Sequence, residues 1–195
     1  MTGTADDAPA ADALARLVTA ATDTAFDDLA DDTRLVGRSP GDGDGSGPAS
    51  HAAVVFEDAT AVIGVVPRVD AEIARRLLAA VDEGAAVRLV VTGRALDAAS
   101  GMGGVGLRAA VGSRNVELFA HDRTEESAAS GLRKGQSADS VDVPLALLFV
   151  DDRALIGLFD DEGLAAVLST TDPGVCGWVV ECFERYREAS SPLFE

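Results

Sequence analysis

Apolar positions repeat with helical spacing in some parts of the chain and form short β-branched runs in others. Helical spacing predicts helices over Pro9–Asp31 and Asp70–Glu83, and a last helix that begins at Asp172–Pro173. Short apolar runs, of which the first two are β-branched, predict strands at Ala53–Glu57, Ala61–Val66, Val87–Thr92, Val116–Ala120, Leu145–Val150, Ala154–Phe159 and Leu164–Ser169. This alternation predicts an α/β fold, with a mixed, largely parallel sheet flanked by helices.

Polar and glycine-rich stretches predict where the chain divides. Residues 37–52 are rich in Gly, Ser, Asp and Pro and are expected to form a flexible linker. It separates an N-terminal helical segment, residues 1–36, from an α/β domain, residues 53–195. Within that domain we expect a loop and a short helix over Ala95–Val111, and a surface loop over His121–Asp142.

Charge changes the picture more than overall composition does. The chain has 33 acidic and 16 basic residues and a net charge of −17, and Lys134 is its only lysine. Such a surface repels itself in dilute buffer but is screened in molar salt, where the Debye length falls to about 3 Å. We therefore expect a halophilic protein. An ordinary acidic protein is the alternative.

Other chemistry in the sequence points to no cofactor, no metal and no membrane. Cys176 and Cys182 are six residues apart in one predicted helix, too far apart for a disulfide, and no further ligands complete a zinc site. The carboxylates of Asp58 and Asp160–Glu162 are interpreted as solvated surface. There is no signal peptide and no run of about 18 apolar residues, so we expect a cytoplasmic protein.

The C-terminal part of the chain carries residues that together resemble a known family. They are Asp151–Asp152–Arg153 followed by Gly157, the turn at Phe159–Glu162, Thr171–Asp172–Pro173, Trp178, and Glu184–Arg187 with Pro192–Leu193. In this pattern the chain resembles the sensor domain of haloarchaeal winged-helix transcription regulators, the family named after the middle domain of a methanogen filament regulator. The resemblance covers about Ala53–Glu195 and implies a phospholipase-D-like fold and a regulatory role.

The same resemblance allows a test for phosphodiesterase chemistry. Enzymes of the phospholipase D type carry a His-x-Lys motif, then four residues and an Asp. If Asp151 takes the Asp position, Ala146 stands where Lys would be and Pro144 where His would be, while Gly157 belongs to the turn that follows. An imidazole must attack phosphorus and an ammonium must hold the phosphate, and these two residues can do neither. The motif is therefore interpreted as degenerate.

The resemblance also implies a DNA-binding half, which the sequence before Ala53 does not match. The first fifty residues hold only Arg16, Arg34 and Arg38 as cations, whereas phosphate contacts supply much of DNA affinity. We therefore expect no direct DNA binding by this chain.

A small-molecule effector is the expected ligand. Arg94, Arg108 and Arg114 follow or precede the carboxyl ends of predicted parallel strands, where ligands bind in open α/β sheets. Surface pairing of each arginine with a carboxylate is the alternative. The glycine-rich stretch Ser100–Gly106 lacks the Lys-Ser/Thr of a nucleotide-binding loop and is interpreted as flexible.

Three functions follow from these observations. The first is a non-catalytic, effector-sensing protein linked to transcription regulation. The second is a dimerisation or partner module that acts on a regulator in trans, and facing phospholipase-D-like halves suggest a homodimer. The third is an unrecognised enzyme, which would require His121 and Lys134 to lie beside Asp151 in one cleft. We expect no enzyme and no catalytic residues.

Overall fold

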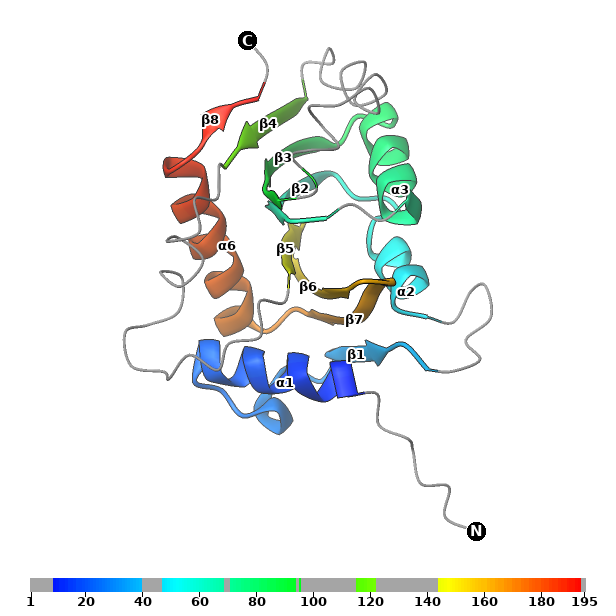
Figure 1. The fold of residues 1–195 in the computed structure, drawn as a ribbon, viewed down its shortest axis with the longest axis vertical. Helices are drawn as coiled ribbons and strands as arrows, with labels where there is room; N and C mark the ends of the chain where they lie inside the picture. The colour runs from blue at the N-terminus through cyan, green and yellow to red at the C-terminus, as the bar shows by residue number, and fades with distance from the viewer. Residues whose placement is uncertain are drawn as a thin grey trace.

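Eight strands form one open sheet at the centre of the computed structural model, which describes residues 9–39, 47–68, 71–93, 95, 115–121 and 144–193 (Figure 1). The strands are β1 (Arg34–Gly37), β2 (Ala61–Val66), β3 (Ala86–Val91), β4 (Val116–Ala120), β5 (Leu145–Val150), β6 (Arg153–Asp160), β7 (Gly163–Thr170) and β8 (Ser191–Pro192). Their order across the sheet is β1-β7-β6-β5-β2-β3-β4-β8. The α/β class and the mixed sheet are confirmed. However, the sheet is parallel only across β2, β3 and β4, and every other pairing between described strands is antiparallel.

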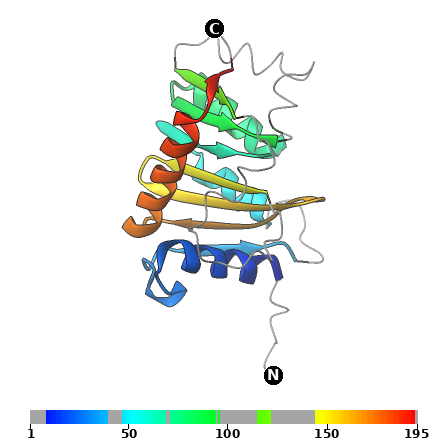
Figure 2. The same cartoon turned by 60° about the vertical axis from the view of Figure 1, so that its left-hand side comes forward.

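Helices cover both faces of the sheet (Figures 1 and 2). One face carries α1 (Pro9–Thr22) and α6 (Pro173–Glu188), and the other carries α2 (Pro48–Val55) and α3 (Ala71–Asp82). A short 3-10 helix, Phe26–Asp28, follows α1. Because both faces are covered, β6 and β7 are buried along almost their whole length.

The helices predicted over Asp70–Glu83 and from Asp172 are confirmed. The contacts at the start of the second helix, α6, explain why it begins there. The Asp172 side chain accepts hydrogen bonds from the amides of Gly174 and Val175, at 2.9 and 3.1 Å, and Pro173 occupies the first turn. These contacts satisfy amides that a helix start leaves without partners. Val175 and Val179, on the inner side of the helix, are fully buried.

The strand predicted at Ala53–Glu57 is wrong, because these residues belong to α2 and the turn that follows it. The helix starts with Pro48 after Gly47, inside the stretch that we expected to be a flexible linker. Ala52 and Ala53 are buried, and Ala52 packs with the adjacent Phe56 against apolar residues of the sheet. A five-residue apolar run does not by itself distinguish a strand from one buried side of a helix.

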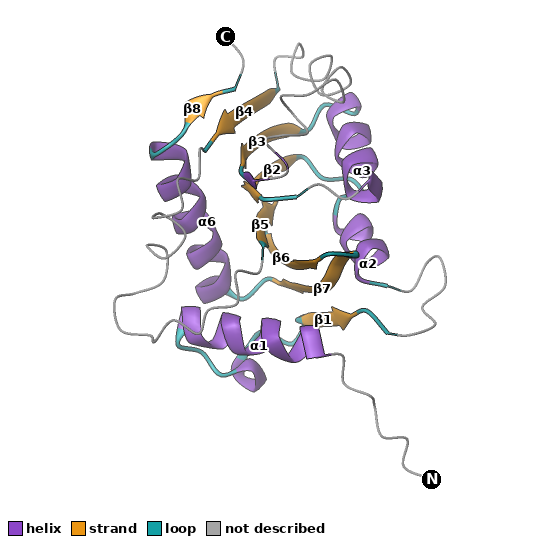
Figure 3. Cartoon of the chain, in the orientation of Figure 1, coloured by secondary structure: helices purple, strands orange, loops and turns teal. Residues whose placement is uncertain are grey.

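The N-terminal segment contributes to the same sheet (Figure 3). The predicted helix over Pro9–Asp31 ends earlier, at Thr22, and the strand β1, which we did not predict, pairs with β7. Leu14 and Val18 of α1 are fully buried in the cluster under α6. The division of the chain at residues 37–52 stays a prediction.

Two predicted regions fall outside what the structure describes. Of the loop and helix expected over Ala95–Val111 only Ala95 is described, and of the loop expected over His121–Asp142 only His121 is described. Both cysteines are free: Cys182 is buried and Cys176 half-buried, and burial raises the pKa of each thiol. None of the described helices is long and apolar enough to span a membrane.

Candidate functional site

Ala146, predicted from the sequence resemblance to stand where a catalytic lysine would, lies inside the protein core. Ala146 is in the second position of β5, 5 % exposed, and pairs in register with Gly157 of β6. Its methyl group faces the α3 side of the sheet, where it lines an apolar cavity of about 40 Å³. Pro144 precedes β5, and its carbonyl accepts a 3.0 Å hydrogen bond from the amide of Phe159. Neither residue presents a group that could attack or hold phosphate.

Asp151 lies in the turn between β5 and β6, where it binds backbone. Its carboxylate accepts hydrogen bonds from the Thr60 hydroxyl at 2.6 Å, and from the amides of Thr60 and Ala61 at 3.1 and 2.9 Å. The Thr60 hydroxyl contributes most to holding the pKa of Asp151 below its ordinary value; burial acts the other way, and the two amides lower it further. These contacts tie the turn to the start of β2.

His121 and Asp151 lie at opposite ends of the parallel strands. Asp151 follows Val150, which pairs with Val62 at the start of β2, whereas the amide of His121 bonds the carbonyl of Val91 at the end of β3. Since β2, β3 and β4 are parallel, these positions are at opposite ends of the strands. The His121 ring packs edge-on against Tyr186, with ring centroids 5.1 Å apart.

Other predicted residues are not described. Arg94, Arg108, Arg114 and Lys134 lie outside the described residues, so the proposed arginine site stays a prediction. Within the described part of the chain, no group of three or more His, Cys, Asp or Glu side chains is placed to hold a metal ion.

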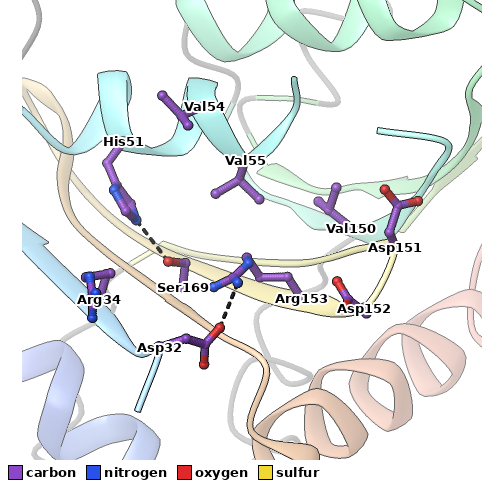
Figure 4. Close-up of a pocket in the computed structure, with 10 residues that line it drawn as sticks. All are labelled: Asp32, Arg34, His51, Val54, Val55, Val150, Asp151, Asp152, Arg153 and Ser169. Carbon is purple, nitrogen blue, oxygen red and sulfur yellow. Dashed lines mark hydrogen bonds and ion pairs between the residues drawn. The ribbon is translucent and has the colours of Figure 1, made fainter. Parts of the chain in front are cut away.

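A cavity lies where the β5–β6 turn meets α2 and β1 (Figure 4). It has a volume of about 450 Å³, in the range of small-molecule sites. We call it the turn cavity. It is lined by Asp32, Arg34, His51, Val54, Val55, Val150, Asp151, Asp152, Arg153 and Ser169. One wall comes from the N-terminal part of the chain and the other from β5, β6 and β7.

An ion pair joins the two walls of the turn cavity. Arg153 Nη2 lies 2.6 Å from Asp32 Oδ2, and both side chains are about two-thirds buried. Asp32 also accepts a 2.9 Å hydrogen bond from the Thr171 hydroxyl. Burial acts to raise the pKa of Asp32, but the hydrogen bonds from Thr171 and Arg153 outweigh it, so the pKa lies below the ordinary value.

His51 faces the same cavity from α2. Its Nε2 shares a 2.9 Å hydrogen bond with the hydroxyl of Ser169, which is 1 % exposed on β7. Burial lowers the pKa of His51, and the positive charges of Arg153 and Arg34 lower it further. The imidazole is therefore uncharged near pH 7.

Sequence reasoning did not find the turn cavity. Residue 51 was assigned to a flexible linker, and Asp32 and Ser169 belong to no recognisable motif. The one local signal in the sequence was Pro48, which can begin a helix, followed three residues later by His51. Its partner Ser169 is 118 residues away in the sequence, and the packing of α2 on β7 brings the two side chains together.

Comparisons with known proteins agree with part of the expected resemblance. Residues 138–189 match the family profile of the methanogenesis regulatory protein FilR1, middle domain. No curated protein sequence matches this chain. The matched stretch contains the degenerate motif positions and the β5, β6 and β7 wall of the turn cavity, but not the wall formed by Asp32, Arg34 and His51.

Solved structures share the fold. TrmBL2, an archaeal chromatin protein with a novel mode of DNA binding, is 17 % identical with a TM-score of 0.52, over 83 % of this chain and 54 % of its own. This chain thus spans about half of the TrmBL2 chain. Nuc, a phospholipase D family member from Salmonella typhimurium, is 15 % identical with a TM-score of 0.57, over 84 % of this chain and 100 % of its own.

The fold is therefore phospholipase-D-like, and at these identities the structural likeness concerns architecture alone. The more specific similarity is that of residues 138–189 to a domain of a regulatory protein. That similarity points to a domain associated with transcription regulators.

Proposed function

We infer that this chain is a non-catalytic, effector-sensing domain that serves transcription regulation in a salt-adapted archaeon. One observation carries the proposal: the stretch similar to a regulator's middle domain has Pro144 and Ala146 at the positions where catalysis would need histidine and lysine. A phospholipase-D-like fold without its catalytic groups keeps a scaffold that can still bind small molecules.

The surface of the described residues favours sensing over a partner module. Val54 is the only large hydrophobic side chain exposed within the described ranges, at 61 %, and it borders the turn cavity. Docking surfaces for proteins expose larger contiguous apolar patches. The net charge of −17 supports salt adaptation, and it makes direct DNA binding by this chain unfavourable.

Thermal denaturation in molar KCl tests the proposal. The protein is heated with a panel of sugars, nucleotides, organic acids and phosphate esters at constant ionic strength. A ligand that binds only the folded state raises Tm by mass action, about 2.7 kcal/mol of stabilisation at 100 times its Kd. We expect saturable stabilisation by at least one compound class. A protein that no compound stabilises contradicts the sensing function.

A further inference from the structure

We propose that the turn cavity is the effector site and that its ligand is a small organic anion, held by its carboxylate or phosphate group at Arg34 and His51. The proposal rests on the sensing function above and names the site and the ligand class. It differs from the arginine site predicted from the sequence, because none of Arg94, Arg108 and Arg114 takes part in it.

Arg34 is the side chain that an anion would meet first. Its described hydrogen bonds go to the carbonyls of Asp31 and Thr33, at 3.4 and 3.1 Å, and among the described residues it makes no ion pair with a carboxylate. A guanidinium presents several N–H donors in one plane, which suits the oxygens of a carboxylate or phosphate.

The two ends of the turn cavity differ in charge. Arg34, His51 and Ser169 lie at one end, and Asp151 and Asp152 at the other, with Arg153 and Asp32 between them (Figure 4). Because Arg153 and Arg34 lower the pKa of His51, their positive charge is felt at the imidazole. An anionic group is thus attracted to the arginine end and repelled from the aspartate end.

Apolar side chains line the cavity between these polar groups. Val54 and Val55 of α2 and Val150 of β5 contribute to its lining. Burying the carbon skeleton of a ligand against them adds roughly 25 cal/mol per Å² of apolar surface removed from water. Inorganic phosphate, which has no such skeleton, should therefore bind more weakly than an organic carboxylate or a phosphate monoester.

A ligand in this cavity would contact residues from the N-terminal and the C-terminal parts of the sequence. Arg34 and His51 belong to β1 and α2, whereas Arg153 and Ser169 belong to the stretch similar to the regulator's middle domain. The Arg153–Asp32 ion pair already joins these walls. Occupation of the cavity would therefore fix α2 and β1 against β7.

Ligand-dependent Tm shifts in molar KCl test the site. The probes are pyruvate and 2-oxoglutarate as carboxylates, glycerol 3-phosphate and 3-phosphoglycerate as phosphate esters, inorganic phosphate, and glycerol as the neutral control. The variants are Arg34→Gln and Val54→Glu, which should leave the unliganded Tm nearly unchanged because both side chains are exposed. Arg16→Gln, an exposed residue of α1 outside the cavity, is the control of equal charge change.

We expect an organic anion to stabilise the wild type and Arg16→Gln equally, with affinity reduced about tenfold to 100-fold in Arg34→Gln and Val54→Glu. The carboxylate and ester arms show which anionic group is preferred. Equal anion binding by Arg34→Gln would place the site elsewhere and leave the sensing function intact, and stabilisation by neutral compounds alone would overturn the anion class. A wild type that no probe or compound stabilises contradicts both proposals.

Discussion

The hydroxyl of Thr60 donates a 2.6 Å hydrogen bond to the carboxylate of Asp151, which joins the β5–β6 turn to the start of β2. Asp151 has φ +54°, a left-handed backbone that Asp adopts more readily than most residues. Asp151, which the sequence resemblance predicts to stand where a catalytic aspartate would, thus shapes a turn and satisfies backbone amides.

A double-mutant cycle measures this contact. Thr60→Val should lower the free energy of unfolding by about 0.5–2 kcal/mol, because it removes a hydrogen bond to a charged acceptor. The same substitution should cost less in an Asp151→Asn background, where the acceptor is neutral. Because hydrogen bonding lowers the pKa of Asp151 in the folded protein, the Thr60 contribution is complete above about pH 4 and falls as the pH drops through the folded pKa.

Urea unfolding in molar KCl checks these values, with Asp152→Asn as the control. Asp152 occupies the same turn, and its side chain makes no hydrogen bond within the described residues, so its substitution should change stability by less than about 0.5 kcal/mol. Equal losses from Asp151→Asn and Asp152→Asn would contradict a structural role for Asp151.

Restoring a lysine at position 146 should damage the protein. Ala146 is 5 % exposed in an apolar cluster, so Ala146→Lys buries an ammonium with no partner. We expect a loss of roughly 3 kcal/mol or more. Val54→Lys, which adds the same group at an exposed position on α2, should cost less than about 0.5 kcal/mol.

The urea midpoints of the two lysine variants test whether position 146 lies in the core. If Ala146→Lys were as stable as Val54→Lys, the side chain would have found solvent or an anionic partner. The position would then be part of an accessible site and not of the core.

His51 should make stability depend on pH in a window near neutrality. Burial and the charges of Arg153 and Arg34 lower its pKa in the folded protein, so the unfolded chain binds this proton more readily. Its contribution is complete above the unfolded pKa of about 6.5 and falls as the pH drops below that value, until the folded pKa is reached. Asp32, which faces the same cavity, has a lowered pKa and titrates below this window.

Chemical unfolding between about pH 7.5 and 5 measures the effect. The wild-type midpoint should fall more over this range than that of His51→Asn, which keeps a hydrogen-bonding group toward Ser169 but does not titrate. Parallel pH profiles for the two proteins would show that His51 is not held uncharged by its surroundings.

Much of the fold could be predicted because periodicity and caps are local signals. The apolar runs at β2 to β7 are too short for helices, those at β2 and β3 are rich in β-branched residues, and Asp172–Pro173 marks the start of α6. What failed depended on tertiary contacts. The four residues of β1 become a strand by pairing with β7, and α2 is held as a helix by burial of Ala52 and Phe56. The antiparallel pairing of β5, β6 and β7 could have been predicted from the two-residue connections between them, because parallel strands need much longer connections.

Less of the candidate site could be predicted. The degenerate motif is contiguous in sequence, so the burial of Ala146 was foreseeable once the strand was identified. The turn cavity is different, because Asp32, His51 and Ser169 come from three separate elements. No local spacing connects them, and their proximity follows from the strand order of the sheet.

The absence of phosphodiesterase chemistry is the central claim, and hydrolysis of bis(4-nitrophenyl) phosphate tests it most directly. The wild-type protein, folded in molar KCl, should release 4-nitrophenolate no faster than the protein-free solution, because Pro144 offers no nucleophile and Ala146 no charge. Saturable, protein-dependent hydrolysis that is abolished by His121→Ala would contradict the account.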